Sequence, residues 1–561
     1  MSAVNRRTMI ARTTAVAAGT AGAGLIGQPA VAAPRRQGGT APPAQHTAGA
    51  KIGPDDPRYT LLTTGNNQRF VARPDYFKMI RSSVDAEQAL RDALKEGKRI
   101  SVRSGGHCFA DLVCNPDVEV VLDFSEMTGV TYDEGRKAFA VEPGARLLNV
   151  YETLYKGWGV TIPGGMCYSV GAGGHVLGGG YGLLSRAHGL VVDHLYAVEV
   201  VVADEHHQVK TVIATRDPHD PHHDLWWAHT GGGGGNFGLV TRYWFRSPQA
   251  HGTEPSEQLV QPPSQMLVSA LSFPWADLSE REFTRLMKNY SSWHEANSSS
   301  NSPYTALSSV FNVCHKAHGS LDLFTQVDAS VPDAEKLLTQ YLQAITAGTG
   351  LSPKAMTKPS GDLAAMPHLS SAQRMPWLTA TKLIGTNNPT ITHPNLRGAH
   401  KSAYMKKAFI DHHAAALYRY LTSKDYWNAD SMVVLFSFGG QVNHASSDAT
   451  ANSQRSSIFK MLFQGFWAEE TGDRAGLQWA RDFYETFFKD TGGAPVPGDH
   501  YEGCYINYPD KDLTDPQRNR SGTPWQQIYY RDNYKRLQSI KGKWDPANVF
   551  HHSMSVSPAR H

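Results

Sequence analysis

The sequence predicts an α+β protein with two domains. The chain has 561 residues, 40% of them hydrophobic, and this length exceeds what a single hydrophobic core usually holds. Short apolar strands alternate with amphipathic helices from residue 76 to about residue 247. Near residue 250 the composition becomes rich in Pro and Ser, and longer helical patterns follow. This order is compatible with two successive domains or with one domain inserted into the other.

The first part of the chain supplies the short elements. Residues 85–96 have the apolar spacing of an amphipathic helix, and residues 147–157 show the same periodicity. Apolar and β-branched runs predict strands at residues 99–103, 118–124, 138–141, 195–203 and 239–245. The run at 195–203 is apolar almost throughout, which predicts a buried strand.

The second part of the chain supplies longer elements. Helical patterns cover residues 407–421 and 472–488. Strands are expected at residues 306–313, 321–327 and 432–438. After residue 498 the chain is rich in aromatic residues, and residues 533–549 predict a final helix and turn.

The N-terminus has the pattern of an export signal. Arg6 and Arg7 precede a weakly hydrophobic stretch, and small residues before Pro34 offer a cleavage site near Ala33. The paired arginines favour the twin-arginine route to secretion; the alternative is a chance pair in a disordered tail. No other stretch contains 18 consecutive apolar residues, so we expect no membrane span.

Charge and cysteine content narrow the function further. The chain has 54 Lys and Arg against 51 Asp and Glu, and so even a balance argues against a nucleic-acid binder. Five cysteines are too few for a disulfide scaffold. Cys108 and Cys114 are close enough in sequence for a local disulfide, but each could equally be a buried thiol.

Three glycine clusters are the most informative feature, at residues 103–108, 163–182 and 231–238. Glycine allows the backbone to approach a ligand closely, and successive backbone N–H groups can surround an anion. Any one cluster could be a tight loop. Together they predict a site that holds a pyrophosphate and a ring system.

A nicotinamide-binding Rossmann site is the obvious competitor. It requires G-x-G-x-x-G directly after a strand and at the start of a helix. Gly171 and Gly173 supply the first two glycines, but Val176 occupies the third position and the residues before Gly171 are turn-like. The Rossmann interpretation is therefore rejected.

Three motifs carry a family resemblance: Arg-Ser-Gly-Gly-His at 103–107, Gly-x-Cys-x-x-Val-Gly-x-Gly-Gly-His at 165–175 and Asn-Tyr-x-Asp at 507–510. With them, almost all of the chain after residue 57 resembles the berberine-bridge-enzyme-like branch of the vanillyl-alcohol-oxidase flavoproteins. Within that branch it is most similar to bacterial oxidases of glycosylated secondary metabolites. The resemblance implies a PCMH-type FAD-binding domain split between the two ends of the chain. A substrate domain of antiparallel sheet covered by helices would be inserted between them.

The expected segments follow from this organisation. They are an export signal at 1–33, a disordered linker at 34–56, the first part of the FAD-binding domain at 57–250, the substrate domain at 251–495, and the second part of the FAD-binding domain at 496–561.

The resemblance also implies the flavin contacts. His107 matches the histidine bonded to the flavin 8-methyl carbon, and Cys167 matches the cysteine bonded to ring carbon 6. Imidazole and thiolate are both nucleophiles, so the chemistry suits two covalent links to FAD. The other implied cofactor-binding residues are Arg103, Ser104, Gly105, Gly106, Cys108, Gly165, Val170, Gly171, Gly173, Gly174, His175, Gly178, Gly179, Gly182, Gly235, Asn236, Phe237, Gly238, Val240 and Asn507.

Tyr508 is the catalytic candidate. Oxidation of an alcohol by hydride transfer to the flavin needs a base near the substrate hydroxyl, and Tyr508 matches the tyrosine that the family uses. A free phenol has a pKa near 10, so a partner that stabilises the phenolate is required. The sequence does not identify that partner, and the alternative for Tyr508 is an ordinary aromatic residue.

Two further positions refine the reaction. In the family, a valine at the position of Val170 resembles the form that admits oxygen, which favours an oxidase that produces H2O2. Phe436 and Phe438 lie where some relatives place tyrosines. A second oxidation step is therefore in doubt.

Paired histidines at 206–207, 222–223, 412–413 and 551–552 invite a metal interpretation. Neighbouring residues of a regular element point apart, and no Cys, His and carboxylate cluster has recognised metal spacing. We therefore expect surface or loop histidines and no metal.

Several functions remain open. The first is a secreted FAD oxidase that acts on a hydroxyl of a sugar or a glycosylated or polyketide-type metabolite, with O2 as the acceptor. An oligosaccharide oxidase acting on the anomeric hydroxyl is the close alternative, and ring closure or amine oxidation is a third. A non-catalytic exported protein that binds flavin or carbohydrate is the option from another class. The substrate and the oligomeric state are not determined by the sequence.

Overall fold

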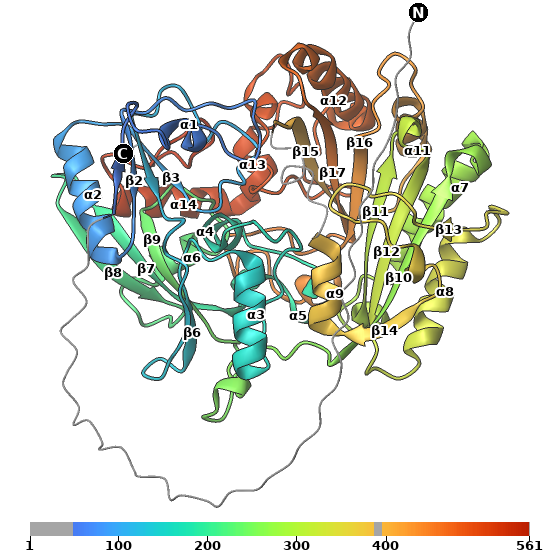
Figure 1. Ribbon diagram of the computed structural model, residues 1–561, viewed down its shortest axis with the longest axis horizontal. Helices are drawn as coiled ribbons and strands as arrows, with labels where there is room; N and C mark the ends of the chain where they lie inside the picture. Colours follow the sequence, from blue (N-terminus) through green and yellow to red (C-terminus); the bar gives the residue numbers. More distant parts are fainter. Residues whose placement is uncertain (1–48, 386–394, 560–561) are drawn as a thin grey trace, which may run out of the picture. The chain divides into compact units, whose positions relative to one another are not determined.

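The structure is a computed structural model that describes residues 49–385 and 395–559. The predicted export signal and residues 34–48 of the predicted linker lie outside these ranges. The chain from Thr47 to His561 forms one compact unit, and its described residues form three sheets (Figure 1). Helices and antiparallel sheets together confirm the α+β class.

Two of the sheets come from the first part of the chain. One is four-stranded, in the order β1 (Lys51–Ile52), β2 (Tyr76–Met79), β4 (Val120–Asp123) and β3 (Ile100–Arg103). In it β4 pairs in parallel with both β2 and β3. The other is antiparallel and five-stranded, in the order β5 (Val130–Asp133), β6 (Ala138–Val141), β9 (Leu239–Phe245), β7 (Leu195–Ala203) and β8 (Val209–Thr215).

Short helices connect these strands. They are α2 (Ser83–Lys95), α3 (Leu147–Trp158), α4 (Ala172–Leu177), α5 (Ser185–His188) and α6 (His223–Ala228). Helix α2 begins after Ser82, whose side chain accepts a hydrogen bond from the Asp85 N–H at 3.1 Å, a standard N-cap. Helix α3 ends at Gly159, whose φ of +72° suits a C-terminal glycine.

The third sheet is formed by the middle of the chain and is antiparallel. Its order is β13 (Lys354–Ala355), β10 (Gln265–Pro274), β12 (Ser320–Asp328), β11 (Leu307–Cys314), β16 (Ser431–Ser437), β17 (Phe459–Trp467) and β15 (Arg397–Met405), with β14 (Gln373–Pro376) also paired to β10. The α-helices that the described residues form in this region are α7 (Glu280–Ala296), α8 (Ala334–Thr346), α9 (Trp377–Ile384), α11 (Asp411–Leu421) and α12 (Asp473–Phe487).

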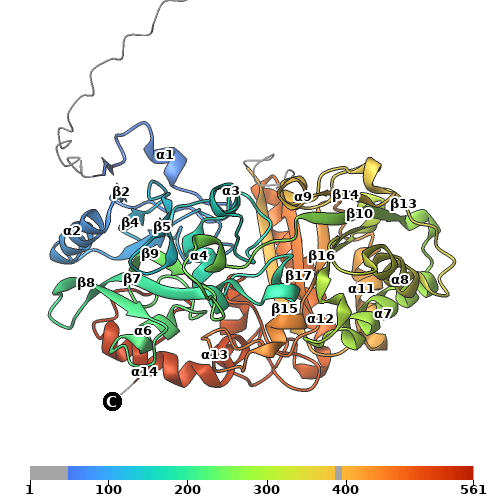
Figure 2. The same cartoon turned by 90° about the horizontal axis from the view of Figure 1, so that it is seen from below.

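The two faces of this third sheet have different neighbours. Helices α7, α8 and α11 lie on the side of the sheet away from α4 and β7 (Figure 2). On β17, Phe463 packs against Phe483 and Phe487 of α12. Strand side chains alternate between faces, so Lys460 and Gln464 of β17 point the opposite way, toward the first part of the chain.

The C-terminal segment returns to the first part of the chain. It forms α13 (Trp525–Tyr530) and α14 (Tyr534–Trp544). The buried Lys541 Nζ of α14 donates to the carbonyl of Asn236 in the third glycine cluster at 2.7 Å, and Lys543 pairs with Asp224 of α6 at 2.8 Å. The sheet-and-helix region between residues 265 and 487 is thus inserted between two parts that pack together.

The strands expected at 138–141, 195–203 and 239–245 have the predicted bounds. The linker prediction is wrong at its end: Lys51 and Ile52 form β1, paired with β2, because Ile52 is buried against Phe77 and Val121. The helix expected from residue 407 begins at Asp411. None of the helices built by the described residues combines the length and apolar character that a membrane crossing requires.

Candidate active site

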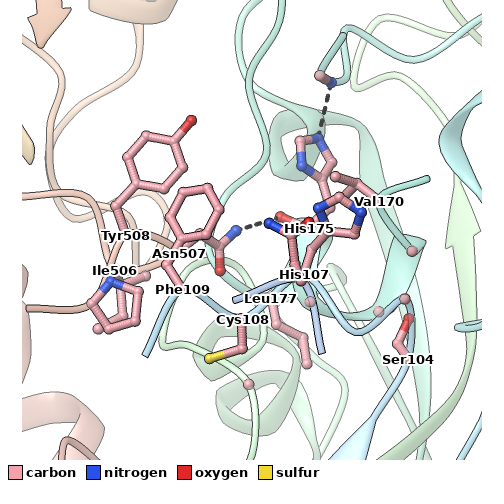
Figure 3. A pocket seen from close by; sticks show the side chains of 18 of the residues that line it. Ser104, His107, Cys108, Phe109, Val170, His175, Leu177, Ile506, Asn507 and Tyr508 are labelled. Atoms are coloured by element: carbon pink, nitrogen blue, oxygen red, sulfur yellow. Dashed lines mark hydrogen bonds between the residues drawn. The ribbon is translucent and has the colours of Figure 1, made fainter. Parts of the chain in front are cut away.

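A cavity of about 300 Å³ lies between the glycine clusters, the third sheet and the C-terminal segment. Ser104, His107 and Val170 line it from the glycine-rich side, and Asn507 and Tyr508 line it from the C-terminal segment (Figure 3). Motifs separated by hundreds of residues therefore meet at one site.

Most of the residues expected to bind the cofactor line this cavity. They are Arg103, Ser104, Gly105, Gly106, His107, Cys108, Gly165, Cys167, Val170, Gly171, Gly173, Gly174, His175, Gly182, Gly235, Asn236, Gly238, Val240 and Asn507.

Gly178, Gly179 and Phe237 were expected among the cofactor-binding residues but are not among the residues that line the cavity. A Cβ at Gly178 would meet the Asn507 side chain at 2.3 Å, and one at Gly179 would meet Asn452 at 2.7 Å. Phe237 is buried, with its ring centroid 5.8 Å from that of His229. These residues allow close packing behind the cavity wall, a role that a motif alone does not distinguish from ligand contact.

His107 is held as a neutral imidazole. Its Nε2 lies 2.7 Å from Ser169 Oγ, and the described residues offer no hydrogen bond to its Nδ1. Burial, with a smaller contribution from the charge of Arg146, lowers the pKa of His107 to about 4. In the neutral tautomer that carries its hydrogen on Nε2 and donates it to Ser169, Nδ1 keeps a lone pair for nucleophilic attack.

The loops around His107 and Cys167 are joined through their backbones. A Cβ on Gly105 would lie 2.3 Å from the Gly171 nitrogen, so only glycine permits this approach. Arg146 donates to the carbonyl of Gly105 at 3.0 Å and also to that of Ser169. Sequence analysis missed Arg146, which lies outside all three glycine clusters.

Arg103 does not offer its charge to a ligand. Its guanidinium forms a buried ion pair with Asp123 at 2.6 Å and donates to the carbonyl of Leu62 at 2.5 Å. A phosphate in this part of the cavity would therefore rely on backbone N–H groups of the glycine loops.

His175 and Asn507 connect two walls of the cavity. The Gly165 N–H donates to His175 Nε2 at 3.1 Å, and burial lowers the pKa of His175 to about 4, which keeps the ring an acceptor. The Asn507 amide donates to the His175 carbonyl at 3.1 Å (Figure 3). The glycine loop at 165–175 is thereby fixed to the motif that contains Tyr508.

The Tyr508 loop is anchored by a buried ion pair. Lys401 of β15 contacts Asp510 at 2.8 Å and Asp512 at 2.7 Å. The Tyr529 hydroxyl donates to the Tyr508 carbonyl at 3.2 Å and accepts from the Asp510 N–H at 2.9 Å. Asp510 of the Asn-Tyr-x-Asp motif thus holds the backbone that carries Tyr508.

Tyr508 has two partners that the sequence did not reveal. Its hydroxyl lies 2.8 Å from the hydroxyl of Tyr181. The Nζ of Lys460 lies 2.9 Å from the Tyr181 ring centroid and 4.4 Å from that of Tyr508. Lys460 is fully buried, and its Nζ has no hydrogen-bond partner among the described residues. This is a cation–π arrangement in a desolvated site.

Burial perturbs all three groups. It raises the pKa of Tyr508 well above its usual value, although the hydrogen bond from Tyr181 counteracts this. It also lowers the pKa of Lys460 well below the ordinary lysine value. A negative charge on Tyr508 and a positive charge on Lys460 would each stabilise the other, because opposite charges at short range favour both ionised forms.

The third sheet contributes a mixed wall. Among the residues of this sheet that line the cavity, Asn312 and Gln464 carry side-chain amides. The hydroxyls of Ser309 and Ser437 instead bond to each other at 2.9 Å, and that of Ser309 accepts from Tyr341 of α8 at 3.0 Å. Phe436 also lines the cavity, and its ring meets Tyr181 edge-on at 5.6 Å, whereas Phe438 packs behind at 6.2 Å. Amide groups beside aromatic rings suit a ligand with several hydroxyl groups.

One histidine pair differs from the expectation of surface or loop residues. His413 lies in α11, fully buried, stacked on Phe487 and 2.6 Å from the Tyr501 hydroxyl. The correction arises because packing with distant segments decides burial. His551 and His552 lie in a loop, as expected, and also line the cavity, with His552 Nε2 3.1 Å from the Gly234 carbonyl.

Other ionisable clusters lie in the described part of the chain. Cys314, His318 and Asp322 bring potential ligand atoms within 4.8 Å of one another, as do His412, His413 and Asp490. Sequence spacing did not reveal either group. Hydrogen bonds already join their members: His318 contacts Asp322 at 3.1 Å, for example. Cys108 and Cys114 are not bridged.

The cavity fits FAD. No atom lies within 4 Å of a Cβ placed on Gly174, a glycine of the cavity wall, so the backbone there faces open space. His107 and Cys167, the two nucleophiles, line the same cavity as Tyr508. A flavin with its ring near these side chains and its phosphates along the glycine loops would meet the groups that such a cofactor needs.

Comparison with known proteins agrees with this fit. Residues 74–209 match the family described as a FAD binding domain, and residues 504–557 match the berberine and berberine-like family. The chain is 45% identical to an aclacinomycin-N/aclacinomycin-A oxidase of Streptomyces galilaeus, over 91% of this chain and 90% of that protein. It is 31% identical to a hexose oxidase of Chondrus crispus, over 89% and 93% of the two chains.

Solved structures give the same result. A glycopeptide hexose oxidase complexed with teicoplanin is 42% identical, has a TM-score of 0.84, and covers 91% of this chain and 99% of its own. An aclacinomycin oxidoreductase is 45% identical with a TM-score of 0.85, over 91% of this chain and 100% of its own. The chain therefore belongs to the berberine-bridge-enzyme-like family of FAD-linked oxidases, with a PCMH-type FAD-binding domain split around an inserted substrate domain.

Proposed function

We propose that this protein is a secreted oxidase that carries FAD on His107 and Cys167 and oxidises a hydroxyl group of a sugar or a glycosylated secondary metabolite. Dioxygen would accept the electrons and leave as H2O2. The observation that carries the proposal is the Tyr181–Tyr508 hydroxyl pair, at 2.8 Å, in a cavity that His107 and Cys167 also line. The cavity thus brings together a base, Tyr508, and the two nucleophiles His107 and Cys167 that would be linked to the flavin.

The residues of the cavity have separate tasks in this reaction. Bound FAD would supply the hydride acceptor. Tyr508 accepts the proton of the substrate hydroxyl, and Tyr181 stabilises the resulting phenolate by donating its hydrogen bond to it. Lys460, 4.4 Å from the Tyr508 ring centroid, offsets the negative charge. The surrounding rings exclude water, which strengthens these interactions.

The substrate class is supported from two directions. The amides of Asn312 and Gln464 on the third sheet line the cavity and can bind hydroxyl groups. The relatives reported above are named as an oxidase of aclacinomycin, a hexose oxidase and a glycopeptide hexose oxidase. An oligosaccharide substrate oxidised at its anomeric hydroxyl is the second candidate, supported by the hexose oxidase similarity. Val170 lines the cavity and supports dioxygen as the acceptor.

The deciding experiment has two readouts. The purified protein is precipitated with acid, and the pellet is analysed by visible spectroscopy and peptide mapping. Flavin on both His107 and Cys167 would support the double link, and yellow colour released to the supernatant would remove it. Peroxide production is then followed with a panel of free sugars, oligosaccharides and glycosides. A folded, yellow protein inactive on every member would favour a non-catalytic binding protein.

Export is tested separately. The twin-arginine proposal rests on Arg6 and Arg7 and on the small residues before Pro34. Replacement of both arginines by lysine should leave the protein in the cells. The wild-type protein should be recovered from the medium with a new N-terminus near residue 34. Equal secretion of the two forms would contradict this route.

A further inference from the structure

Asp362 lies beside Cys167, in a loop of the substrate domain that the sequence did not single out. The Cys167 thiol donates a hydrogen bond to Asp362 Oδ2 at 3.0 Å. The two residues are 195 positions apart in the sequence, and both line the cavity. We propose that Asp362 is the base that takes the proton of Cys167 when this thiol becomes bonded to the flavin ring. The inference rests on the proposed double link.

The loop holds Asp362 at the tip of a tight turn. Ser360 and Leu363 exchange two backbone hydrogen bonds, at 2.8 and 3.0 Å, which leaves Gly361 and Asp362 as the central pair. Gly361 has a φ of +54°, a conformation that glycine adopts without strain. The turn directs a carboxylate, and no other ionisable side chain of its own, to the Cys167 sulfur.

Two further contacts fix the turn to the sheet. The Asn312 amide, on β11, donates to the Ser360 carbonyl at 2.7 Å and to the Ser360 hydroxyl at 3.1 Å. Leu363 is fully buried. Asp362 is therefore positioned by the core of the substrate domain, whereas Cys167 belongs to a glycine loop of the FAD-binding domain. The contact is made only when the two domains pack together.

The chemistry of the attachment needs such a base. A thiol attacks as its thiolate, and free cysteine has a pKa near 8.5. Burial raises the pKa of Asp362, which brings the carboxylate closer to the thiol in basicity and improves proton transfer between them. Burial also raises the pKa of Tyr151, which lies near Cys167, so this phenol stays protonated and does not compete for the proton.

The proposed step balances as follows. The thiol proton passes to Asp362 while the sulfur forms a bond to ring carbon 6. The hydrogen of that carbon leaves as a proton, and the two electrons released remain on the ring until dioxygen removes them as H2O2. The net change is one sulfur–carbon bond gained, one S–H and one C–H bond lost, and one O2 reduced. Asp362 returns its proton to solvent through the cavity.

The test compares Asp362→Asn with Cys167→Ser, Asp362→Glu and wild type. Each protein is purified, digested and mapped for flavin on residues 107 and 167. We expect wild type to carry flavin on both residues, and Asp362→Asn to carry it on His107 alone, as Cys167→Ser does, but with Cys167 present as an alkylatable thiol. Asp362→Glu, which keeps a carboxylate, should restore the second link.

A second measurement separates loss of the base from misfolding. Purified Asp362→Asn protein is held in air at neutral and at alkaline pH, and the link to residue 167 is followed by mass spectrometry. At neutral pH the link should form about a hundredfold more slowly than in wild type, and alkaline pH should accelerate it because hydroxide then supplies the thiolate. This pH rescue would not be produced by a merely structural role.

Three outcomes would overturn the inference. Complete linkage of Cys167 in Asp362→Asn would show that no base is needed there, while leaving the double link intact. A link that stays absent at alkaline pH would make Asp362 a structural residue. Wild-type protein without flavin on Cys167 would remove both the double link and the role of Asp362. This outcome differs from the other two because the link is then missing in wild type and not only in the Asp362 variant.

Discussion

The two long walls of the active-site cavity are built in different ways. The glycine wall, at residues 103–108, 165–175 and 233–238, presents backbone, and its charged residue Arg103 is already paired with Asp123. The sheet wall presents side chains, among them Phe436 and the polar Gln464. The buried Lys460 of the same sheet lies over the ring of Tyr181, which lines the cavity. Backbone N–H groups are present whatever the side chains are, so they suit the binding of a cofactor that does not change. Side chains can be exchanged, so the sheet wall is where substrate choice and proton chemistry are set.

The largest effect is expected where the two walls meet. Replacement of Tyr508 by Phe should slow anaerobic flavin reduction about a thousandfold, because general-base catalysis contributes on the order of 10²–10⁴. Flavin content should not change. Stopped-flow absorbance with excess substrate measures the rate. Tyr181→Phe is the matched control and should cause a smaller loss, since it removes a hydrogen bond but leaves the base.

The next effect concerns the ion pair between Arg455 and Asp193, which joins two distant segments of the chain. Arg455 holds Asp193 through two hydrogen bonds, at 2.7 and 2.9 Å. Burial alone would raise the pKa of Asp193, but Arg455 more than offsets this, so that pKa lies below its usual range. Arg455→Met would leave a buried, unpaired carboxylate and should lower the free energy of unfolding by about 3–5 kcal/mol.

The loss of stability in Arg455→Met should depend on pH, and the direction of this dependence follows from the depressed pKa of Asp193. A depressed carboxylate pKa stabilises the fold above the unfolded value, near 3.9, and the contribution fades as the pH falls through the folded value. The difference between Arg455→Met and wild type should therefore be largest near neutral pH. It should shrink as the pH falls first through the raised pKa of the unpaired Asp193 in the variant and then through the depressed pKa in wild type. Urea denaturation across this range measures it. A difference independent of pH would mean that Arg455 acts through packing alone.

Two glycine substitutions test the backbone wall. A Cβ at Gly105 would meet backbone atoms of Gly171 at 2.3 and 2.9 Å, whereas one at Gly174 would meet nothing within 4 Å. Gly105→Ala should therefore destabilise the protein by roughly 1–3 kcal/mol. Gly174→Ala should leave thermal stability unchanged but reduce flavin loading, because the methyl group would occupy the cavity. Equal behaviour of the two variants would contradict a wall that approaches a ligand at Gly174.

A smaller effect is expected from the buried cation of the sheet wall. Lys460→Met keeps the volume but removes the charge above Tyr181 and Tyr508. Without that charge the phenolate is less stable, so the pKa of Tyr508 rises further. The rate of flavin reduction should fall by about tenfold near neutral pH, or 1.4 kcal/mol, and recover at higher pH. An unshifted pH profile would limit Lys460 to packing.

The sequence by itself determined the glycine wall and most of the local structure. Strands such as 195–203 were predicted from continuous apolar runs, and Arg-Ser-Gly-Gly-His identified the loop of His107, because backbone recognition requires glycine at fixed spacing. The class of cofactor was also predicted, through motifs that lie within a few neighbouring residues, and one of these motifs supplies Tyr508, the proposed base.

Only the tertiary structure decided the sheet wall. Asp362 and Tyr181 reach one cavity from separate segments, and Lys460 lies over the Tyr181 ring; no spacing in the sequence predicts that meeting. The same limit explains the error at His413, whose burial depends on packing against Phe487. Local chemistry can be read from neighbouring residues. Desolvation, charge pairing and contact across domains depend on long-range packing, which places residues hundreds of positions apart within hydrogen-bond distance.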